Sequence, residues 1–136
     1  MKHTYKFKLY RSKHLRKLER LLHIACFVYN HCIVLQKRCY RLYKKNITAF
    51  TLNKHLAKLK RMQKFSFWKE LNSQTIQDIS ERVCRSYKSF FSNVKRDKRM
   101  KPPHKRKAIY YSSITYKQTG YKIEGNVLML QQKYRI

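Results

Sequence analysis

Residues 13–44 read KHLRKLERLLHIACFVYNHCIVLQKRCYRLYK, and this stretch decides the fold. Its apolar side chains recur every three or four residues, which is the repeat of one face of an α-helix. The members of this stripe are Leu15, Leu18, Leu22, Ala25, Tyr29, Cys32, Leu35, Cys39 and Leu42. Basic side chains occupy the other face of the helix. The pattern therefore predicts a long amphipathic helix, with Ser12 as a candidate N-cap.

Two further helices are predicted after this one. Thr51 is expected to cap a short basic helix with the inner side chains Leu52, Leu56, Leu59 and Met62. An aromatic linker or a short helical turn then holds Phe65, Phe67 and Trp68. A third helix starts at Asn72 or Ser73, and its regular apolar stripe consists of Ile76, Ile79, Val83, Tyr87, Phe90 and Val94. The sequence thus predicts three main helices within residues 12–96.

Short strands are predicted at both ends of the chain. Tyr5, Phe7 and Leu9 alternate with lysines, as in a half-buried strand. Residues 109–130 hold further strand-like runs, and the turn at 124–126 predicts a hairpin. The N-terminal strand is expected to pair with the later ones, because a lone strand is not stable. The fold class is α+β: a helical insert (12–96) and a basic linker (97–107) interrupt a small β unit formed by residues 1–11 and 108–136.

The charge of the chain points to a polyanionic partner. Lysine and arginine number 34 against 6 acidic residues, which gives a formal net charge of +28. A compact chain of this charge repels itself unless a polyanion or counterions screen it. Nucleic acid is favoured because the charge spans the whole chain and is interleaved with side chains that stack on bases. A standalone cationic nucleic-acid-binding protein and a membrane-surface cationic protein remain alternatives.

Hydropathy and cysteine usage predict a cytoplasmic protein, nucleoid-associated if the source is bacterial. No run reaches the roughly 18 apolar residues needed to span a bilayer, so no membrane partner is expected. The N-terminus lacks the apolar core of a secretory signal. The four cysteines (Cys26, Cys32, Cys39 and Cys84) contain no CxxC pair. They are interpreted as reduced thiols that pack as small apolar side chains.

Catalysis by this chain is not expected. Metal-dependent phosphodiester cleavage needs several converging carboxylates. The pairs Asp78–Arg82 and Glu81–Arg85 have i,i+4 spacing instead, which predicts ion pairs on the outer face of the third helix. A zinc site from the cysteines is disfavoured, since their spacing separates the thiols by about 10 Å along a helix. No glycine-rich phosphate loop is present. No catalytic residue, metal or cofactor is therefore predicted.

Four runs of sequence, in the same order, resemble the N-terminal part of the TnpB-type transposon-encoded RNA-guided nucleases, relatives of the type V CRISPR effectors. The runs are Tyr5-Lys6-Phe7-Lys8-Leu9-Tyr10, Phe27-Val28-Tyr29-Asn30, Phe67-Trp68-Lys69-Glu70-Leu71-Asn72-Ser73-Gln74 with Ile76-Gln77, and Tyr87-Lys88-Ser89-Phe90-Phe91. The resemblance implies a helical recognition insert in a small, incomplete antiparallel β-barrel. It also implies that the chain binds guide RNA and target-flanking DNA.

The chain departs from this family at several points. Arg11 stands where the family has proline, and Pro102-Pro103-His104-Lys105 stands where the family reads P-R-F-K. The RuvC-type nuclease domain and its four-cysteine zinc module are absent. The resemblance therefore implies a truncated protein whose missing C-terminal nuclease half would be a partner.

The predicted nucleic-acid-binding residues are of two kinds. Cations are expected to hold phosphates, and these are Lys6, Lys8, Arg11, Lys13, Lys37, Arg38, Lys58, Lys60, Arg85, Lys95, Arg96, Lys105 and Arg106. By resemblance, a second set faces duplex DNA, and its amides suit adenine edges; this set is Tyr29, Asn30, Ser73, Gln74 and Gln77. The alternatives are a buried tyrosine with an asparagine partner and an ordinary helix cap at Ser73.

Overall fold

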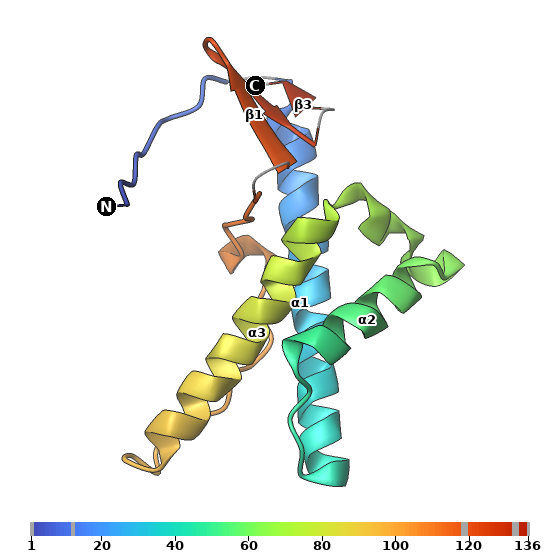
Figure 1. Cartoon of the computed structure of the whole chain (residues 1–136), viewed down its shortest axis with the longest axis vertical. Helices are drawn as coiled ribbons and strands as arrows, with labels where there is room; N and C mark the ends of the chain where they lie inside the picture. Colours follow the sequence, from blue (N-terminus) through green and yellow to red (C-terminus); the bar gives the residue numbers. More distant parts are fainter. Residues whose placement is uncertain (1, 12, 118–119, 132–133, 136) are drawn as a thin grey trace.

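A computed structural model describes residues 2–11, 13–117, 120–131 and 134–135 of the chain (Figure 1). Within these residues it contains three α-helices, two 3-10 helices and a three-stranded antiparallel sheet. The helical elements are α1 (Leu15–Tyr43), α2 (Ala49–Lys60), η1 (Gln63–Glu70), α3 (Ser73–Val94) and η2 (Ala108–Tyr110). The strands are β1 (Tyr121–Glu124), β2 (Val127–Leu130) and β3 (Tyr134–Arg135). The α+β class and the three main helices are confirmed.

Helix α1 is the predicted long helix and forms the centre of the core. The predicted Tyr29 and Cys32 are buried, and so are Val28 and Ile33, which lie outside the predicted stripe. The buried face is wider than expected because α3, η1 and η2 all contact this helix. Leu42, the last member of the stripe, is 56% exposed. It lies where the ends of α1 and α3 diverge (Figure 1).

Side-chain caps fix the starts of α2 and α3. Thr48, rather than the expected Thr51, is the N-cap of α2, and its hydroxyl accepts a hydrogen bond from the Thr51 amide at 3.3 Å. Thr51 therefore lies inside the first turn. Helix α3 starts at Ser73, within the expected range, but Asn72 and not Ser73 is its cap, and the Asn72 side-chain oxygen accepts an amide hydrogen bond of 2.8 Å. Helix α1 follows His14 without a side-chain cap, and Ser12 lies outside the described residues.

The aromatic run between α2 and α3 folds as the 3-10 helix η1, in agreement with the expected short helical turn. Trp68 is fully buried at its centre. The Trp68 ring lies 4.7 Å from Phe65 and 5.4 Å from His31, measured between ring centroids. Trp68 thereby joins η1 to the middle of α1.

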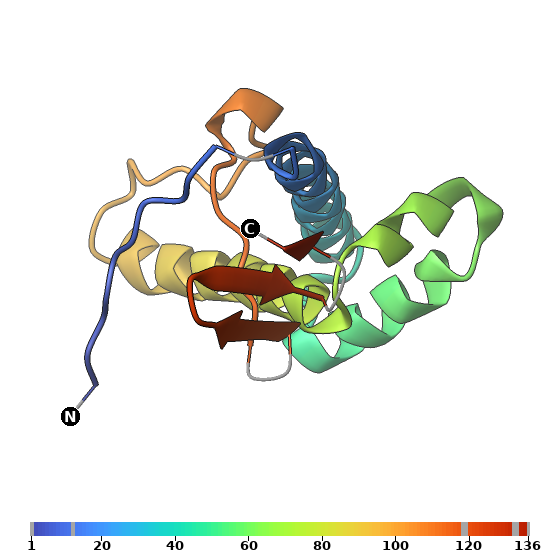
Figure 2. The same ribbon diagram turned by 90° about the horizontal axis from the view of Figure 1, so that it is seen from above.

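The predicted stripe of α3 is buried over its first four turns and opens toward its end. Ile76, Ile79, Val83 and Tyr87 are buried, whereas Phe90 and Val94 are half-buried. The change follows from geometry, because α3 crosses α1 and then runs away from it (Figures 1 and 2).

The sheet confirms the predicted hairpin. Strands β1 and β2 are antiparallel, with Glu124 opposite Val127 and Tyr121 opposite Leu130. Gly125 is the first of the two turn residues and has a φ of +57°. A positive φ at this position is typical of a type II′ turn and is adopted by glycine without a steric penalty. Strand β3 pairs with β2 on the other edge.

The expected N-terminal strand is wrong for the free chain. Residues 2–11 are extended but pair with no other described strand, and they trail away from the body (Figure 2). Tyr5 is 75% and Phe7 is 82% exposed. The reason is the lack of a covering face: all four residues of β1 are exposed, so the small sheet offers nothing that would bury the aromatic side of this segment.

Residues 108–117 belong to the helical body rather than to the β unit in which they were expected. Tyr111 is buried in the core, and Ile114 packs against it. The Thr75 hydroxyl of α3 donates to the Thr115 carbonyl at 2.9 Å. The β unit therefore begins at Tyr121, after a chain segment that is tied to α3.

Candidate nucleic-acid interface

The cations lie on the surface, and the few carboxylates are mostly engaged. Every described lysine and arginine side chain is exposed except Lys60, Arg82 and Lys117, which are half-buried. Four carboxylates form ion pairs: Glu70 with Arg20, Asp78 with Arg82, Glu81 with Lys117 and Glu124 with Lys122. The positive surface is therefore almost unopposed, and its field attracts anions from solution.

Three adjoining hollows run between α1 and α3 and beneath residues 100–106, which we call the linker segment. The Tyr29 hollow has a volume of about 260 Å³ and is lined by Arg85, Arg106 and Tyr111 among others. The linker hollow, about 330 Å³, shares Tyr29 and Arg106 with it. The Tyr40 hollow, about 390 Å³, shares Phe90 and Pro102 with the linker hollow. Together they form what we call the α1–α3 groove.

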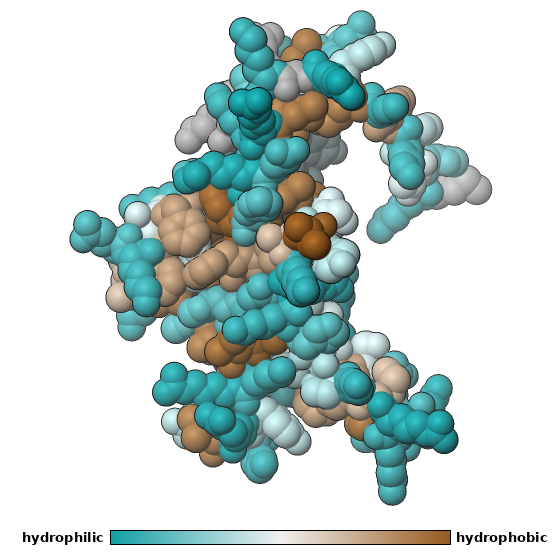
Figure 3. Space-filling view, turned by 180° about the vertical axis from the view of Figure 1, so that it is seen from behind, coloured by the Kyte–Doolittle hydropathy of each residue, from teal (hydrophilic) through white to brown (hydrophobic). Residues whose placement is uncertain are grey.

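The walls of this groove are cationic and aromatic. Its seven cations are Lys37, Arg41, Lys44, Arg82, Arg85, Lys101 and Arg106. Its six aromatic residues are Tyr29, Tyr40, Tyr87, Phe90, Phe91 and Tyr111. None of the described residues that line it is acidic. On the face that carries the linker segment, hydrophobic patches lie between hydrophilic side chains (Figure 3). Such a mixture suits a chain that carries both phosphates and rings.

Asn30 holds the linker segment over the groove. Its side-chain amide donates to the Arg106 carbonyl at 2.9 Å, and its side-chain oxygen accepts from the Arg106 amide at 2.8 Å. The Cys26 thiol donates to the same carbonyl at 3.4 Å. The Arg106 guanidinium lies over the Tyr29 ring, 5.4 Å from its centroid. These contacts fix a cation at the boundary between two hollows.

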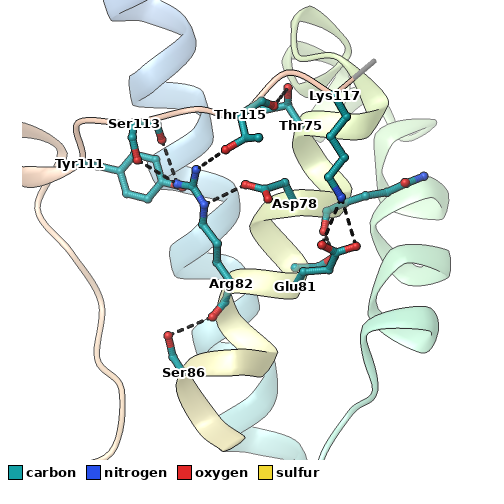
Figure 4. Close-up of polar contacts among 11 residues, drawn as sticks. Thr75, Asp78, Glu81, Arg82, Ser86, Tyr111, Ser113, Thr115 and Lys117 are labelled. Atoms are coloured by element: carbon teal, nitrogen blue, oxygen red, sulfur yellow. Dashed lines mark hydrogen bonds and ion pairs between the residues drawn. The ribbon is translucent and has the colours of Figure 1, made fainter. Parts of the chain in front are cut away.

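Arg82 holds the segment after η2 against α3 (Figure 4). Its guanidinium pairs with Asp78 at 2.8 Å and donates to the Ser113 carbonyl at 3.0 Å and the Thr115 hydroxyl at 2.7 Å. Asp78 is buried, so the expected exposed ion pair is in fact an internal one. Burial raises the pKa of Tyr111, whose hydroxyl accepts a further hydrogen bond from Arg82.

The second expected ion pair on α3 is also corrected. Glu81 pairs with Lys117, with 3.2 Å between the charged atoms, and not with Arg85 one turn along the helix. Lys117 reaches Glu81 because the 111–117 segment is tied to α3 at Thr115 (Figure 4). Arg85 is left on the wall of the Tyr29 hollow.

The structure brings together four of the predicted site residues. Tyr29, Lys37, Arg85 and Arg106 line the α1–α3 groove. Lys105 lies beside it in the exposed linker. Tyr29 is only 5% exposed, and both polar groups of the Asn30 side chain bond to backbone. The two residues are therefore better described as structural, in line with the alternative given above, than as contacts to bases.

The remaining predicted residues lie elsewhere. Lys58 and Lys60 are on α2, and burial lowers the pKa of Lys60, with Lys69 nearby as a second cause. Ser73 and Gln77 are exposed on the first turns of α3, where Gln74 is half-buried. The other cations are Lys6, Lys8, Arg11 and Lys13 before α1, Arg38 on α1, and Lys95 and Arg96 just after α3.

Sequence reasoning missed the residues at the open end of the groove. These are Tyr40, Arg41, Lys44, Phe91, Lys101 and Pro102. A signal was present, because Lys37, Tyr40, Arg41 and Lys44 are spaced by three and four residues and so share one face of α1. Only Lys37 of these four residues was predicted to bind, since nothing in the sequence shows that α3 and the linker segment flank this face.

The cysteines form no metal site among the described residues, which contain no group of three or more His, Cys, Asp or Glu side chains suited to a metal ion. Cys26 and Cys32 are buried, as predicted. Burial raises the pKa of Cys32 to about 12, and the neighbouring Cys84 adds to the shift. A thiol with this pKa stays protonated at neutral pH and is a poor nucleophile and metal ligand.

Helix α1 corrects the expectation about bilayer-spanning segments. By length and composition it is apolar enough to cross a membrane. In this structure, however, 44% of its most apolar stretch is buried inside the protein. A central core helix satisfies the same criterion, so this property is weak evidence for a membrane location.

Comparison with models of protein families finds none that matches the chain, and comparison with curated proteins finds no similar sequence.

Proposed function

We propose that this protein binds nucleic acid through the α1–α3 groove and the basic surface around it. The observation that carries the proposal is the groove itself: seven cations and six aromatic side chains line it, without a carboxylate among its described residues. Lysine and arginine neutralise phosphates and release counterions, which supplies affinity. Among the aromatic side chains, Tyr40 is 41% exposed and Phe90 and Phe91 are half-buried, so these three can add stacking surface. The other three are buried and form the floor of the groove. The function would be exercised in the cytoplasm, on the nucleoid if the cell is bacterial.

The resemblance to TnpB-type proteins makes the proposal more specific. In this view the helical body is a recognition module that holds guide RNA and contacts target-flanking DNA. The small sheet would be one part of an antiparallel barrel, which residues 4–10 would join only when a further part, such as a nuclease half, supplies a covering face. The exposed aromatic side of residues 4–10 supports this view, because such a side is normally buried in a sheet.

Strand cleavage by this chain alone is not part of the proposal. Carboxylates that hold divalent metals must converge and remain available. Glu70, Asp78, Glu81 and Glu124 are each engaged by a cation, and Asp97 accepts a hydrogen bond from the Arg99 amide at 3.0 Å. The chain is therefore expected to bind without cutting.

The test is the salt dependence of binding to RNA and to DNA. Each phosphate contact contributes about 0.9 to the log–log slope on duplex DNA and about 0.7 on single strands. The variant Lys37→Gln, Arg41→Gln, Lys101→Gln removes three groove cations and should lower the slope by about 2 to 3. The matched control Lys54→Gln, Arg61→Gln, Lys64→Gln removes the same charge from α2 and its surroundings. It should change the slope by less than about 1.

Three outcomes would contradict the proposal. A wild-type slope below about 2 would mean that few phosphates are bound. Equal losses in the two triple variants would show that net charge matters and that the groove does not. Tight binding to anionic liposomes that RNA fails to displace would favour the membrane-surface alternative, to which the apolar character of α1 also contributes.

A further inference from the structure

The Tyr40 hollow differs from the rest of the groove in its chemistry. Its floor is made of rings: Tyr40 and Phe91 have centroids 5.6 Å apart, and Phe90 and Phe91 are 5.2 Å apart. Pro102 of the linker segment closes one side. Lys37, Arg41 and Lys44 are the only charged residues among its described lining, and all are exposed. An apolar floor is thus bordered by cations.

The ring of Tyr40 is held in place and still accessible. It is 41% exposed, packs on Phe91, and has the flexible Lys44 ammonium over its ring, 5.6 Å from the centroid. Lys44 itself is positioned by the end of α1, where it adopts a left-handed conformation with a φ of +53°. A fixed aromatic face beside a cation is the arrangement on which unpaired bases stack in proteins that bind single strands.

We infer that the Tyr40 hollow binds an unpaired nucleobase, and that the α1–α3 groove accordingly prefers a single-stranded polynucleotide to a duplex. This inference rests on the proposed function. In a duplex the faces of the bases stack on one another, so a protein ring reaches them only after a base has been extruded at an energetic cost. A single strand offers its bases without that cost.

The cations of the groove mark a path along which the strand would continue from this base. Phosphates next to the bound base would lie against the cations on the rim of the Tyr40 hollow. Further along, beyond Pro102, the strand would reach Lys101 and then Arg106 and Arg85 in the neighbouring hollows. An acyl chain would also fit an apolar floor, but a cationic wall that continues through three hollows suits a repeating anion better than a single headgroup.

The experiment compares Tyr40→Ala with Tyr43→Ala on an oligouridylate and on a blunt duplex of equal length. Tyr43 lies one turn further along the same helix, is 69% exposed and does not line the groove. Loss of one base stack should weaken oligouridylate binding by roughly 5- to 150-fold for Tyr40→Ala. Duplex binding should change by less than about twofold, and Tyr43→Ala should leave both within about twofold.

Photo-crosslinking of a bromouridine oligonucleotide to the unaltered protein provides a second readout that does not depend on a folded variant. Crosslinks at Tyr40 or Phe90 are expected. The inference is overturned if Tyr40→Ala weakens both ligands equally or neither, if crosslinks fall outside the groove, or if anionic vesicles displace the oligonucleotide in a Tyr40-dependent way. In those cases salt-dependent binding by the wild type would still support the proposed function, whereas its absence would remove both.

Discussion

At the scale of single residues, three side-chain amides hold this fold together by the same means. Asn30 bonds to both backbone groups of Arg106, and Gln36 to those of Ile47 at 2.7 and 3.0 Å. Gln131, with its amide oriented to suit its neighbours, donates to the Glu70 carbonyl and accepts from the Asn72 amide, both at 3.0 Å. A carboxamide presents a donor and an acceptor side by side, as a neighbouring strand does. Each therefore satisfies a loop that has no backbone partner there.

Asn30→Asp should destabilise the protein although it changes only one atom. The new carboxylate oxygen would face the Arg106 carbonyl, which loses its amide donor and keeps only the weak Cys26 thiol donor, and the expected cost is about 1–2 kcal/mol. Urea unfolding measures it. Asn46→Asp adds the same charge at an exposed position and serves as the control, because any negative charge relieves repulsion in a chain of +28. Equal stabilities of the two variants would show that the Asn30 contact contributes nothing.

His31 should make stability depend on pH. It lies among aromatic rings, parallel to His55 with 6.0 Å between centroids, and burial first and His55 second lower its pKa from the usual 6.5. Below about pH 6.5 the His31 imidazole is protonated in the unfolded chain but stays neutral in the folded chain. The free energy of unfolding therefore falls as the pH drops from about 6.5 toward the lowered pKa of His31 in the folded state. Above about pH 7 this contribution is constant.

Unfolding experiments between pH 5 and 8 check this expectation. His31→Phe keeps a ring in the aromatic cluster and removes the titrating group, so the free energy of unfolding should vary less with pH over that range. His3→Phe, on the exposed N-terminal segment, should leave the wild-type profile unchanged. A His31→Phe profile as steep as that of the wild type would mean that other groups cause the acid sensitivity.

At the scale of elements, two segments without regular structure, 111–117 and the linker segment, pack across the helices and hold them together. The 111–117 segment crosses α3 and is anchored by Tyr111 in the core and by Arg82 and Thr75 on the helix (Figure 4). The linker segment spans the other side and is anchored by Asn30. Both turn a two-helix contact into a walled groove, which is the feature that the proposed function requires.

Arg82→Ala should cost far more stability than Arg85→Ala. Removing the Arg82 guanidinium leaves the buried Asp78 carboxylate without its cation and removes one anchor of the 111–117 segment, at about 3 kcal/mol. Arg85, one turn away, is exposed, and its loss should change stability by less than about 0.5 kcal/mol. Thermal and urea unfolding decide this. In nucleic-acid binding by the folded molecules the order should reverse, so that Arg85→Ala weakens binding more than Arg82→Ala. The reason is that Arg82 is paired with Asp78, whereas Arg85 is exposed on the groove wall and available to a phosphate.

At the scale of the whole molecule, a helical body carries a small sheet at one end and an extended segment beside it (Figures 1 and 2). The core runs through α1, α2, η1 and α3, and Tyr111 joins it from the segment after η2. Residues 2–11 contribute no member to it. The molecule thus consists of a packed body, a small sheet and a basic N-terminal segment whose aromatic side chains are exposed.

Deletion of residues 2–11 should leave the melting temperature of the free protein unchanged within about 2 °C, because exposed residues away from buried contacts add little stability. It removes Lys2, Lys6, Lys8 and Arg11. Circular dichroism melting of the full chain and the deletion variant provides the measurement. A drop of more than about 4 °C, roughly 1 kcal/mol, would mean that the segment packs on the body in solution.

The sequence by itself determined the helices, the hairpin and the sign of the surface charge. Each of these depends on neighbours along the chain: apolar repeats of three and four residues, a glycine in the turn at 125, and an excess of lysine and arginine. Local signals also predicted the cysteines as buried thiols, which holds for Cys26 and Cys32. They predicted three of the cations that line the groove, whereas Tyr29 was predicted from the family resemblance.

Tertiary structure alone decided what those elements face. The α1–α3 groove exists because α3 diverges from α1 and the linker segment returns between them, and no local pattern encodes that path. Because of the same packing, Asp78 is buried, Glu81 pairs with Lys117, and residues 4–10 have no described strand to pair with. Partners far apart in sequence are chosen by which surfaces bury the most apolar area, and that choice depends on the whole chain at once.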